Sequence, residues 1–519
     1  MRGAVRHLAD GAALVDFPAA ADADANQAAQ DLAAALAAAP AAGLLEAVPA
    51  ARTLLLLFDP DQVAHERIEQ LLERTEALPL ARAARTVRLP ARYGGEDGPD
   101  LDELARAAGL PAGELARLHA AADHRVAFLG FAPGFAYLRG TPRELSVPRL
   151  RSPRLRVPAG SIGVADGYSG IYPAQTPGGW RLIGRVAARM FDPRALPPSL
   201  LLPGDRVVFE PVGAVEFAEL ARAAEEPRTP AISGQPILRV LSPGPFTAVQ
   251  GGPRHGLGAF AVPAGGAMDL PLLAATNALL RNAALAAGLE MTLSGAELEV
   301  LEEARFAIGG DLDASILGRP LAGPGPHAAR RGDRLKLGTL RSGVRAYLCI
   351  GGGLALPPPG ERSRALRRSD EVARAKDPPP PSVPLPPLRP AGTTLELRAL
   401  PGPQSDLFTA EGRREFFSAA YRVSPEGDRR GLRLLGPAVE LAGSADIAPE
   451  GTAPGSVQVP GGGQPIVLGP DRPVTGGYPK IATVIGADLP LLAQARPGAT
   501  IRFRAATLEE ALEARRGWR

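Results

Sequence analysis

The spacing of hydrophobic and polar positions changes once along this chain, close to residue 85. Before that point, apolar runs at 12–17 and 51–59 predict strands. Residues 26–39 have a helix-forming composition, and residues 61–78 add apolar positions at helical spacing. We therefore expect a small α+β unit over residues 1–83.

Short strands and turns follow to the end, with helical segments expected near 102–121, 270–287 and 406–419. The 60 glycines and 55 prolines suit this pattern, because both residues mark bends and break helix interiors. The stretch DPPPPSVPLPPLRPAG, residues 377–392, predicts a polyproline-like surface connector. A second boundary is expected near 214–236, between two strand-rich halves.

An internal repeat relates residues 158–184 to residues 453–486. Each copy has a Gly-Ser pair, an apolar residue ten positions after the serine, and a Gly-Gly-aromatic turn. The matched positions are Ser161 with Ser456, Ile171 with Ile466, and Gly178-Gly179-Trp180 with Gly476-Gly477-Tyr478. The repeat indicates domains related to one another.

A similar strand closes each copy, PGDRVVF at 203–209 and PGATIRF at 497–503. A third such strand, RGDRLKLG at 331–338, occurs without the rest of the repeat. These strands predict three related β-barrel-like domains. The barrels are expected over about 86–212, 237–345 and 395–505.

The predicted fold class is therefore mainly β with an α+β N-terminal domain. A chain of 519 residues has room for three or four domains. In chain order we expect an α+β domain at 1–83, a β-barrel at 86–212, a linker at 213–236, a second barrel region at 237–394 that includes the connector, a third barrel at 395–505 and a helical tail at 506–519.

Composition and charge exclude several classes of protein. The net charge is only +3 and no basic run is interleaved with aromatic residues, so nucleic-acid binding has little support. The single cysteine, Cys349, forms no intramolecular disulfide and suits a reducing compartment. No signal-peptide pattern opens the chain, and no apolar run approaches the roughly 20 residues that span a bilayer. We expect a cytoplasmic protein without membrane contact.

Several signatures of chemistry are absent from the sequence. There is no Walker-type P-loop and no G-x-S-x-G elbow. The six histidines form no pair with metal-ligand spacing, so no metal site is expected. None of the three lysines, Lys336, Lys376 and Lys480, lies between methionines, so we expect no biotin attached to this chain.

Two glycine-dense clusters remain, residues 130–135 with 158–179, and residues 451–480. Glycine-rich loops let backbone N–H groups approach carboxylates and phosphates closely. The polar residues near them are Arg156, Ser161, Tyr172, Gln458, Gln464, Arg472, Thr475, Tyr478 and Lys480. The clusters predict an anion-binding site, with plain barrel corners and solvated loops as the alternative.

Residues 128–186 resemble the B subunit of 5-oxoprolinase, a family also known as allophanate hydrolase subunit 1. The resemblance rests on FLGFAPGFAYL, then VPAGSIGVADGYSGIYPAQTPGGWRLIGRV, and on LLPGDRVVFEP further on. A Bacillus inhibitor of a sporulation kinase belongs to the same family. The match extends over nearly all of residues 1–212.

The second half resembles the C subunit of 5-oxoprolinase, which is also described as a biotin-dependent carboxyltransferase domain. The matching stretches include TAVQ at 247–250, VPAGGAMD at 262–269, GLEMTLSG at 288–295 and the whole of 450–486. The chain thus resembles a natural fusion of the B and C subunits. The same pair of modules forms the carboxyltransferase part of urea carboxylase.

This resemblance implies tandem cyclophilin-like barrels and ATP-dependent opening of the 5-oxoproline ring to glutamate, with Mg²⁺ accompanying ATP. It also implies the separate A subunit of 5-oxoprolinase as partner and a small amide as substrate, and leaves a homo-oligomer open. The implied catalytic residues are Lys480, Tyr478, Arg156 and Asp269. The implied substrate- or ATP-binding residues are Ser161, Tyr172, Gln250, Arg254, Glu290, Gln458, Gln464, Arg472, Thr475, Gly476 and Gly477.

The second half departs from the C-type pattern in several places. Residues 427–431 read GDRRG where the family has an SNRMG-type motif. Gly251, Ala259 and Gly265 stand where the family has Asp, His and Ser. Loss of a carboxylate and an imidazole removes potential acid and base groups. Two alternatives to a 5-oxoprolinase component therefore remain, a non-catalytic regulator of a sensor kinase and a carboxyltransferase module that uses a separate biotin carrier.

Overall fold

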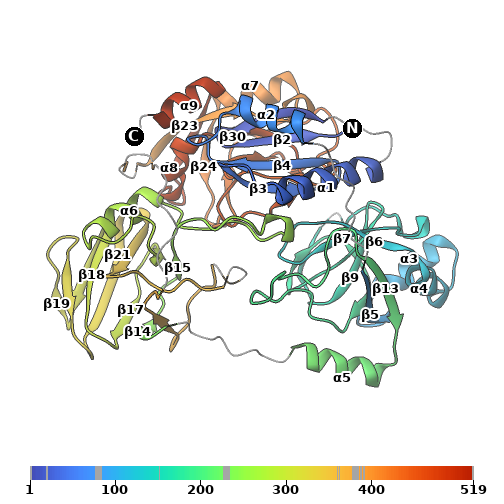
Figure 1. Cartoon of the computed structure of the whole chain (residues 1–519), viewed down its shortest axis with the longest axis horizontal. Helices are drawn as coiled ribbons and strands as arrows, with labels where there is room; N and C mark the ends of the chain where they lie inside the picture. Colours follow the sequence, from blue (N-terminus) through green and yellow to red (C-terminus); the bar gives the residue numbers. More distant parts are fainter. Residues whose placement is uncertain are drawn as a thin grey trace.

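The computed structural model describes residues 3–18, 22–75, 85–150, 152–225, 234–358, 361, 363–376, 385, 388–389 and 392–516. Its strands form an N-terminal sheet, two closed barrels and one large open sheet (Figure 1). The predicted class, mainly β with an α+β N-terminal domain, is confirmed. The expected boundary near residue 83 and most of the connector at 377–392 lie outside the described residues.

The N-terminal domain is a four-stranded antiparallel sheet in the order β1-β2-β4-β3. Its elements are β1 (Ala4–Ala9), β2 (Ala12–Asp16), α1 (Asp22–Ala38), β3 (Leu44–Pro49), β4 (Thr53–Phe58) and α2 (His65–Arg74). Both faces of β4 are buried, which explains its unbroken apolar run. Leu54 and Leu56 pack toward the core with the helices, and Leu55 and Leu57 belong to a second cluster on the other face.

The first barrel follows, closed by seven strands in the order β10-β7-β6-β13-β5-β12-β9. These strands are β5 (Thr86–Tyr93), β6 (His124–Leu129), β7 (Ala136–Arg139), β9 (Ser161–Ala165), β10 (Tyr168–Ile171), β12 (Arg181–Val186) and β13 (Arg206–Pro211). Its first and last strands are parallel neighbours, and α3 (Leu101–Ala108) and α4 (Ala112–Ala121) lie between β5 and β6 in the chain. The short strands β8 (Arg154–Val157) and β11 (Thr176–Gly178) pair outside the barrel.

The second barrel has the corresponding design, in the order β23-β30-β27-β28-β25-β24-β31. Its strands are β23 (Thr394–Pro401), β24 (Ala420–Val423), β25 (Gly431–Leu435), β27 (Ser456–Gln458), β28 (Ile466–Leu468), β30 (Lys480–Val484) and β31 (Thr500–Ala505). Its first and last strands are again parallel, and the short pair β26 (Glu450–Gly451) and β29 (Thr475–Gly476) again lies outside. The repeat detected in the sequence thus corresponds to two barrels of one topology.

The middle domain, which begins at β14 (Pro236–Ser242), differs from the expected third barrel. Its strands form a nine-stranded sheet that is not closed. The other strands are β15 (Phe246–Gln250), β16 (Gly288–Thr292), β17 (Glu297–Val300), β18 (Ala304–Ile316), β19 (Arg319–Pro320), β20 (His327–Ala329), β21 (Arg334–Ile350) and β22 (Glu371–Ala373). The strand that looked like a barrel closure is the start of β21, which pairs antiparallel with β17 at one end and β16 at the other. The first and last strands of the domain, β14 and β22, pair antiparallel. The sheet stays open because β15 and β22, at the two ends of its strand order, are not paired with each other in the described residues.

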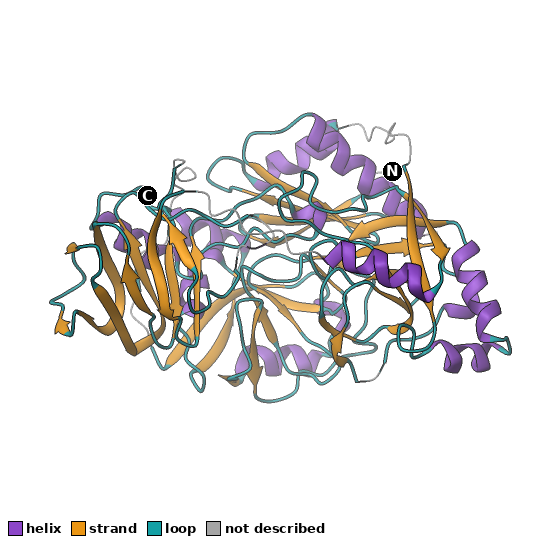
Figure 2. Cartoon of the chain, turned by 90° about the horizontal axis from the view of Figure 1, so that it is seen from below, coloured by secondary structure: helices purple, strands orange, loops and turns teal. Residues whose placement is uncertain are grey.

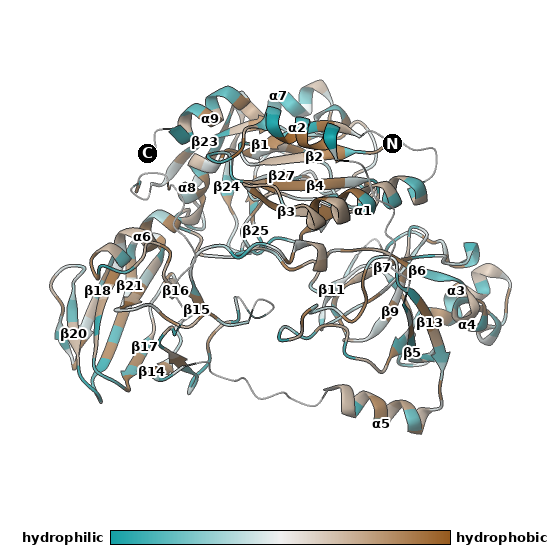
Figure 3. Ribbon diagram, in the orientation of Figure 1, coloured by the Kyte–Doolittle hydropathy of each residue, from teal (hydrophilic) through white to brown (hydrophobic). Residues whose placement is uncertain are grey.

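The N-terminal sheet and the second barrel lie side by side in one layer, above the open sheet and the first barrel (Figure 1). Figure 2, seen from below, shows that strands and loops make up most of the chain. The layer is joined by an apolar cluster in which Leu55 and Leu57 of β4 pack with Ala453 and Val474. Figure 3 shows β4 in the colour of hydrophobic residues. The C-terminal helix α9 (Leu508–Arg516) returns to the N-terminal domain, where Arg515 pairs with Asp61 at 2.8 Å. The first strand and the last helix of the described residues, β1 and α9, therefore lie in the same layer.

The remaining helices are α5 (Ala214–Glu225), α6 (Leu270–Ala278), α7 (Ala410–Ser418) and the short α8 (Leu489–Ala493). Helix α5 lies at the end of the first half, where the linker was expected. None of the helices in the described part of the chain has the length and apolar character needed to cross a bilayer.

The second barrel is expected to depend on Phe416 of α7, which is fully buried and stacks on Phe503 with ring centroids 4.5 Å apart. Replacing Phe416 with Ala should lower the free energy of unfolding by about 3–5 kcal/mol, because the ring fills the core. Leu435→Ala in the same barrel is a matched control, since Leu435 is 51% exposed. Chemical denaturation measures both, and equal losses would contradict this packing.

Candidate functional site

The segment from Asp471 to Lys480 contacts the N-terminal domain and the first barrel directly, and it is linked to the middle domain through Arg429. Asp471 accepts a 2.7 Å hydrogen bond from Arg429 Nε, within a network that reaches the middle domain. Arg472 donates to Thr452 O at 2.8 Å and interacts electrostatically with Glu46 of the N-terminal domain. Burial lowers the pKa of Arg472 to about 10, which leaves it cationic at neutral pH.

The two glycine clusters predicted from the sequence meet at this segment. Thr475 Oγ1 accepts a 3.3 Å hydrogen bond from the backbone N–H of Phe131 in the first barrel. A Cβ on Gly130 would lie 1.7 Å from Thr475 Oγ1, so only glycine fits there without a shift. The guanidinium of Arg149 lies against Gly477, with Nη2 3.4 Å from the position that a Cβ on Gly477 would take.

The stretch that departs from the C-type pattern docks the middle domain on the first half of the chain. Gly256 N–H donates to Glu46 Oε1 at 2.8 Å. A few residues later, Phe260 O accepts a 3.2 Å hydrogen bond from Gly134 N–H of the first barrel. Ala261 is buried in the core cluster of that barrel. Ala259 therefore lies in a docking segment, where packing rather than acid–base chemistry accounts for its neighbours.

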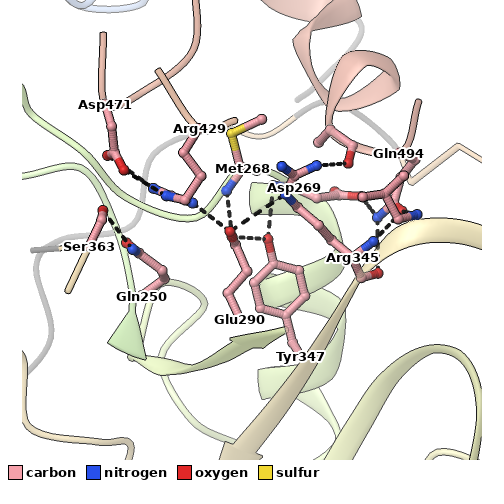
Figure 4. Close-up of polar contacts among 12 residues, drawn as sticks. Gln250, Met268, Asp269, Glu290, Arg345, Tyr347, Ser363, Arg429, Asp471 and Gln494 are labelled. Carbon is pink, nitrogen blue, oxygen red and sulfur yellow. Dashed lines mark hydrogen bonds and ion pairs between the residues drawn. The ribbon is translucent and has the colours of Figure 1, made fainter. Parts of the chain in front are cut away.

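A buried polar network joins the middle domain to the second barrel (Figure 4). Glu290 on β16 is fully buried and accepts hydrogen bonds from Arg429 Nη1 at 2.5 Å and Tyr347 OH at 2.7 Å. Met268 N–H donates to it at 2.8 Å, and Arg345 Nε lies 3.6 Å away. Two guanidinium groups thus enclose one carboxylate.

The charges in this network favour an ionised Glu290. Burial alone would raise its pKa, but Arg429 and Arg345 outweigh that effect and hold the pKa below its usual value. Burial raises the pKa of the Tyr347 hydroxyl well above its ordinary value, and the nearby carboxylates add to the rise. Tyr347 is therefore a hydrogen-bond donor here rather than a base.

Asp269 lies in the same network as the N-cap of α6. One of its carboxylate oxygens accepts from Leu272 N–H at 3.0 Å and the other from Gln494 Nε2 at 2.7 Å. Burial raises its pKa despite these hydrogen bonds. Because both oxygens are occupied, the geometry favours a positioning role for this residue over the predicted catalytic one.

Lys480 is fully buried on β30 and forms an ion pair with Glu450 of β26. Gln404 connects the two residues, since its Nε2 donates to Glu450 Oε1 at 2.7 Å and its Oε1 accepts from Lys480 N–H at 3.2 Å. Gln458, opposite Lys480 in the ladder, donates to Tyr478 O at 3.4 Å. With its ammonium enclosed, Lys480 has the environment of a structural lysine.

The first barrel has a polar group at the place that corresponds to the Lys480 group, but the side chains there carry different charges. Leu182 takes the position of Lys480, two residues after the aromatic residue of the repeat. Its N–H donates to Asp100 at 2.6 Å, and Asp100 also accepts from Arg154 at 2.7 Å. Arg154 and Asp100 of the first barrel thus take the places of Glu450 and Gln404 of the second barrel. The duplicated barrels therefore have different chemistry at equivalent places.

Other predicted residues are not brought together. Tyr172 is buried in an aromatic cluster with Phe135, which accounts for it as core, and burial raises its pKa to about 12. The rest occupy separate surroundings: Ser161 is buried at the start of β9, Arg156 is exposed on β8, Gln464 bonds the backbone of Gly436, Gln250 bonds Ser363, and Arg254 donates to Pro357 O.

Sequence reasoning missed several residues of these networks. They are Arg149, Arg345, Tyr347, Gln404, Arg429, Glu450, Asp471 and Gln494. Arg429 could have been found, because it lies in GDRRG at 427–431, a stretch that stood out as altered. In the described ranges, no group of three or more His, Cys, Asp or Glu side chains is arranged to hold a metal ion.

Models of the carboxyltransferase domain match both halves of the chain. Subdomains C and D match residues 4–201, and subdomains A and B match residues 260–505. The fold and these matches place the chain in the carboxyltransferase-domain class. The B subunit of 5-oxoprolinase from Bacillus subtilis is 34% identical over 232 residues, covering 42% of this chain and 96% of that protein.

The C subunit of 5-oxoprolinase from Escherichia coli is 33% identical over 293 residues, covering 54% of this chain and 94% of that protein. The chain therefore belongs to the families of the 5-oxoprolinase B and C subunits and joins both in one polypeptide. The crystal structure of a protein named TTHA0988 has a TM-score of 0.81 at 34% identity, covering 96% of this chain and 100% of that one. The resemblance inferred from the sequence is confirmed.

Glu290→Gln should lower the free energy of unfolding by about 3–5 kcal/mol, because it removes the charge that compensates two buried guanidinium groups. Since the pKa of Glu290 is lowered in the folded chain, its contribution is complete above its ordinary value of 4.5 and is lost as the pH falls further. Denaturation at a series of pH values should show a smaller acid dependence in the variant. If the variant lost as much stability at low pH as the parent chain, an ionised Glu290 in the folded chain would be contradicted.

Lys480→Met should also lower the free energy of unfolding by about 3–5 kcal/mol, because Glu450 loses its cation inside the protein. The double variant Lys480→Met/Glu450→Gln should recover most of that loss, because no buried charge is then left unpaired. Denaturant titration measures both effects. A double variant that is no more stable than the single one would contradict the ion pair.

Proposed function

We propose that the chain is the fused B and C component of an ATP-dependent 5-oxoprolinase that works with a separate A subunit. The net reaction is 5-oxo-L-proline, ATP and water to L-glutamate, ADP and phosphate. One observation carries the proposal: the chain covers 96% of a relative named as the B subunit, together with 94% of a relative named as the C subunit. The contact between Thr475 and Phe131 supports it, because the B-type and C-type glycine clusters meet there.

The chemistry explains why ATP is needed. A lactam carbonyl is a poor electrophile, and transfer of the γ-phosphoryl group to the amide oxygen releases ADP and activates the carbon. Water then adds, the ring C–N bond breaks, and glutamate and phosphate leave. Cations and backbone N–H groups would stabilise the negative charge that develops on oxygen. At the junction, the Arg149 guanidinium is a cation of this kind: its Nε donates to Asp166 at 2.9 Å, and its Nη atoms lie toward Gly477.

Magnesium would accompany ATP in this reaction. Mg²⁺ commonly binds through one or two carboxylates together with substrate phosphates. The absence of a larger cluster of potential ligands in the described part of the chain fits an ion carried by the nucleotide. The A subunit of the enzyme is the proposed partner, since the matched relatives are named as its B and C subunits.

The purified chain mixed with a homologue of the A subunit should release ADP only when 5-oxoproline is present. The rate should exceed that of the A-type homologue alone by about tenfold or more, since the chain supplies part of the site. 2-Pyrrolidinone is a matched control compound, because it has the same lactam ring without the carboxylate. ADP release that is independent of 5-oxoproline would refute the function.

A second candidate is a carboxyltransferase module, because both matching family models carry that description. Such a module would need a separate biotin carrier. Transfer of a labelled carboxyl group from N-carboxybiotin to a small amide, without 5-oxoproline-dependent ADP release, would favour this candidate over the first.

A further inference from the structure

The loop GFAPGF of the first barrel, residues 130–135, holds a strained backbone. Phe131 has φ +61°, in the left-handed region that bulky side chains rarely adopt. Such outliers cost free energy, persist only where the surroundings impose them, and gather at functional sites. The Phe131 ring is only partly buried, and its edge meets Phe135 at 5.3 Å and Tyr172 at 6.2 Å between centroids.

Both parts of the C-type half hold this loop. From the second barrel, Thr475 Oγ1 accepts the N–H of the strained Phe131 itself. From the middle domain, Phe260 O accepts the N–H of Gly134 at 3.2 Å. Three N–H groups of the loop donate within it, those of Gly130, Ala132 and Phe135, at 2.6–3.0 Å. The other two, of Phe131 and Gly134, donate to the C-type half. The loop therefore takes part of its conformation from two domains that lie more than a hundred residues further along the chain.

Close packing also fixes the GFAPGF loop. Gly130 leaves no room for a Cβ, because Thr475 Oγ1 would be 1.7 Å from it. On the other side of the turn, Gly134 has φ +81° and a Cβ there would lie 2.8 Å from Phe191 Cβ. The loop is thus seated between the barrel that carries it and the barrel that faces it.

We infer that Thr475 is a positioning residue. It fixes the conformation of the GFAPGF loop, so that the substrate site carried by the first barrel is complete only when the second barrel is docked on it. The inference rests on the proposed function, because the loop is taken to orient the small amide substrate. Thr475 acts through the backbone of Phe131 rather than on the reacting atoms. In an enzyme built from separate polypeptides, this contact would make ring opening depend on assembly.

Trp180 reports on the loop independently of any reaction. Its ring lies 5.4 Å from that of Phe135, the last residue of the loop, and it is only 6% exposed. The chain has two tryptophans, and Trp518→Phe leaves Trp180 as the single emitter. Release of the loop should admit a quencher to this ring.

In the Trp518→Phe chain, Thr475→Val removes the acceptor while keeping the shape of the side chain. We expect acrylamide quenching of Trp180 to rise about twofold, and kcat/KM for 5-oxoproline with the A-type partner to fall about fivefold, through kcat, as loss of one hydrogen bond implies. Thr475→Ser keeps the hydroxyl group and should restore both values. Unchanged quenching and kinetics in Thr475→Val would overturn the inference.

Substitutions at Gly130 and Thr475, made singly and together, test the close contact between these two residues. Gly130→Ala should lower the thermal midpoint and raise the quenching of Trp180, and Gly130→Ala/Thr475→Ala should recover part of both, because Oγ1 is gone. Gly113→Ala is the matched control, since a Cβ there meets nothing within 4 Å. No recovery in the double variant would refute the contact. A parent chain that never hydrolyses 5-oxoproline would refute the proposed function, whereas the quenching results decide the loop contact alone.

Discussion

The pairing of Glu290 with Arg429 joins the open sheet to the second barrel, and other parts of the molecule are arranged around it. Arg429 donates to Glu290, to Gly266 O and to Asp471 at once, so one guanidinium connects three segments. A buried ion pair of this kind adds little net stability, but breaking it leaves an uncompensated charge in the interior. The pairing therefore acts mainly as a constraint on how the two domains can sit together. Through Asp471, the same constraint fixes one end of the segment from Asp471 to Lys480.

The two barrels show how a duplicated fold can separate structure from chemistry. Both close through a parallel pairing of first and last strands, and both carry a short two-stranded extension beside the glycine turn. At equivalent positions one has Leu182 and the other Lys480, and the polar partners differ in charge. Side-chain replacements inside a constant backbone are enough to give each barrel its own electrostatics. Fold alone therefore does not assign the same task to both.

Much of the fold could be predicted because its signals are local. Apolar runs marked β2 and β4 of the N-terminal sheet but not β1 and β3, and repeated glycine turns marked the two barrels. The third barrel was predicted from one closing strand, RGDRLKLG, and that strand instead begins the long β21 of an open sheet. The turn residues before a strand and its alternation of polar and apolar residues are the same in a closed barrel and in an open sheet. Which strand a segment pairs with depends on partners far along the chain, and no local pattern reports them.

The sequence named segments for a candidate site but not how they contact one another. Glycine content predicted an anion-binding site in the segments around Gly130 and Thr475, but not that these segments touch. Tyr172 was predicted as a binding residue because its hydroxyl group is polar. In the structure it belongs to the core, since aromatic neighbours surround its ring. Arg149 went unnoticed because nothing in its neighbours along the chain sets it apart. Contact and burial decide such cases, and both are properties of the folded chain.

The sequence by itself determined the class of fold, the duplicated barrels and membership of the two 5-oxoprolinase families, because periodicity, turn residues and motif spacing are encoded locally. Only the tertiary structure decided that the lysine in TGGYPK is enclosed with Glu450, and that the threonine five residues earlier reaches the first barrel. The physical reason is that ion pairing and close backbone contact join residues 30 and 344 positions apart. Distances of that kind along the chain carry no signal in a single sequence.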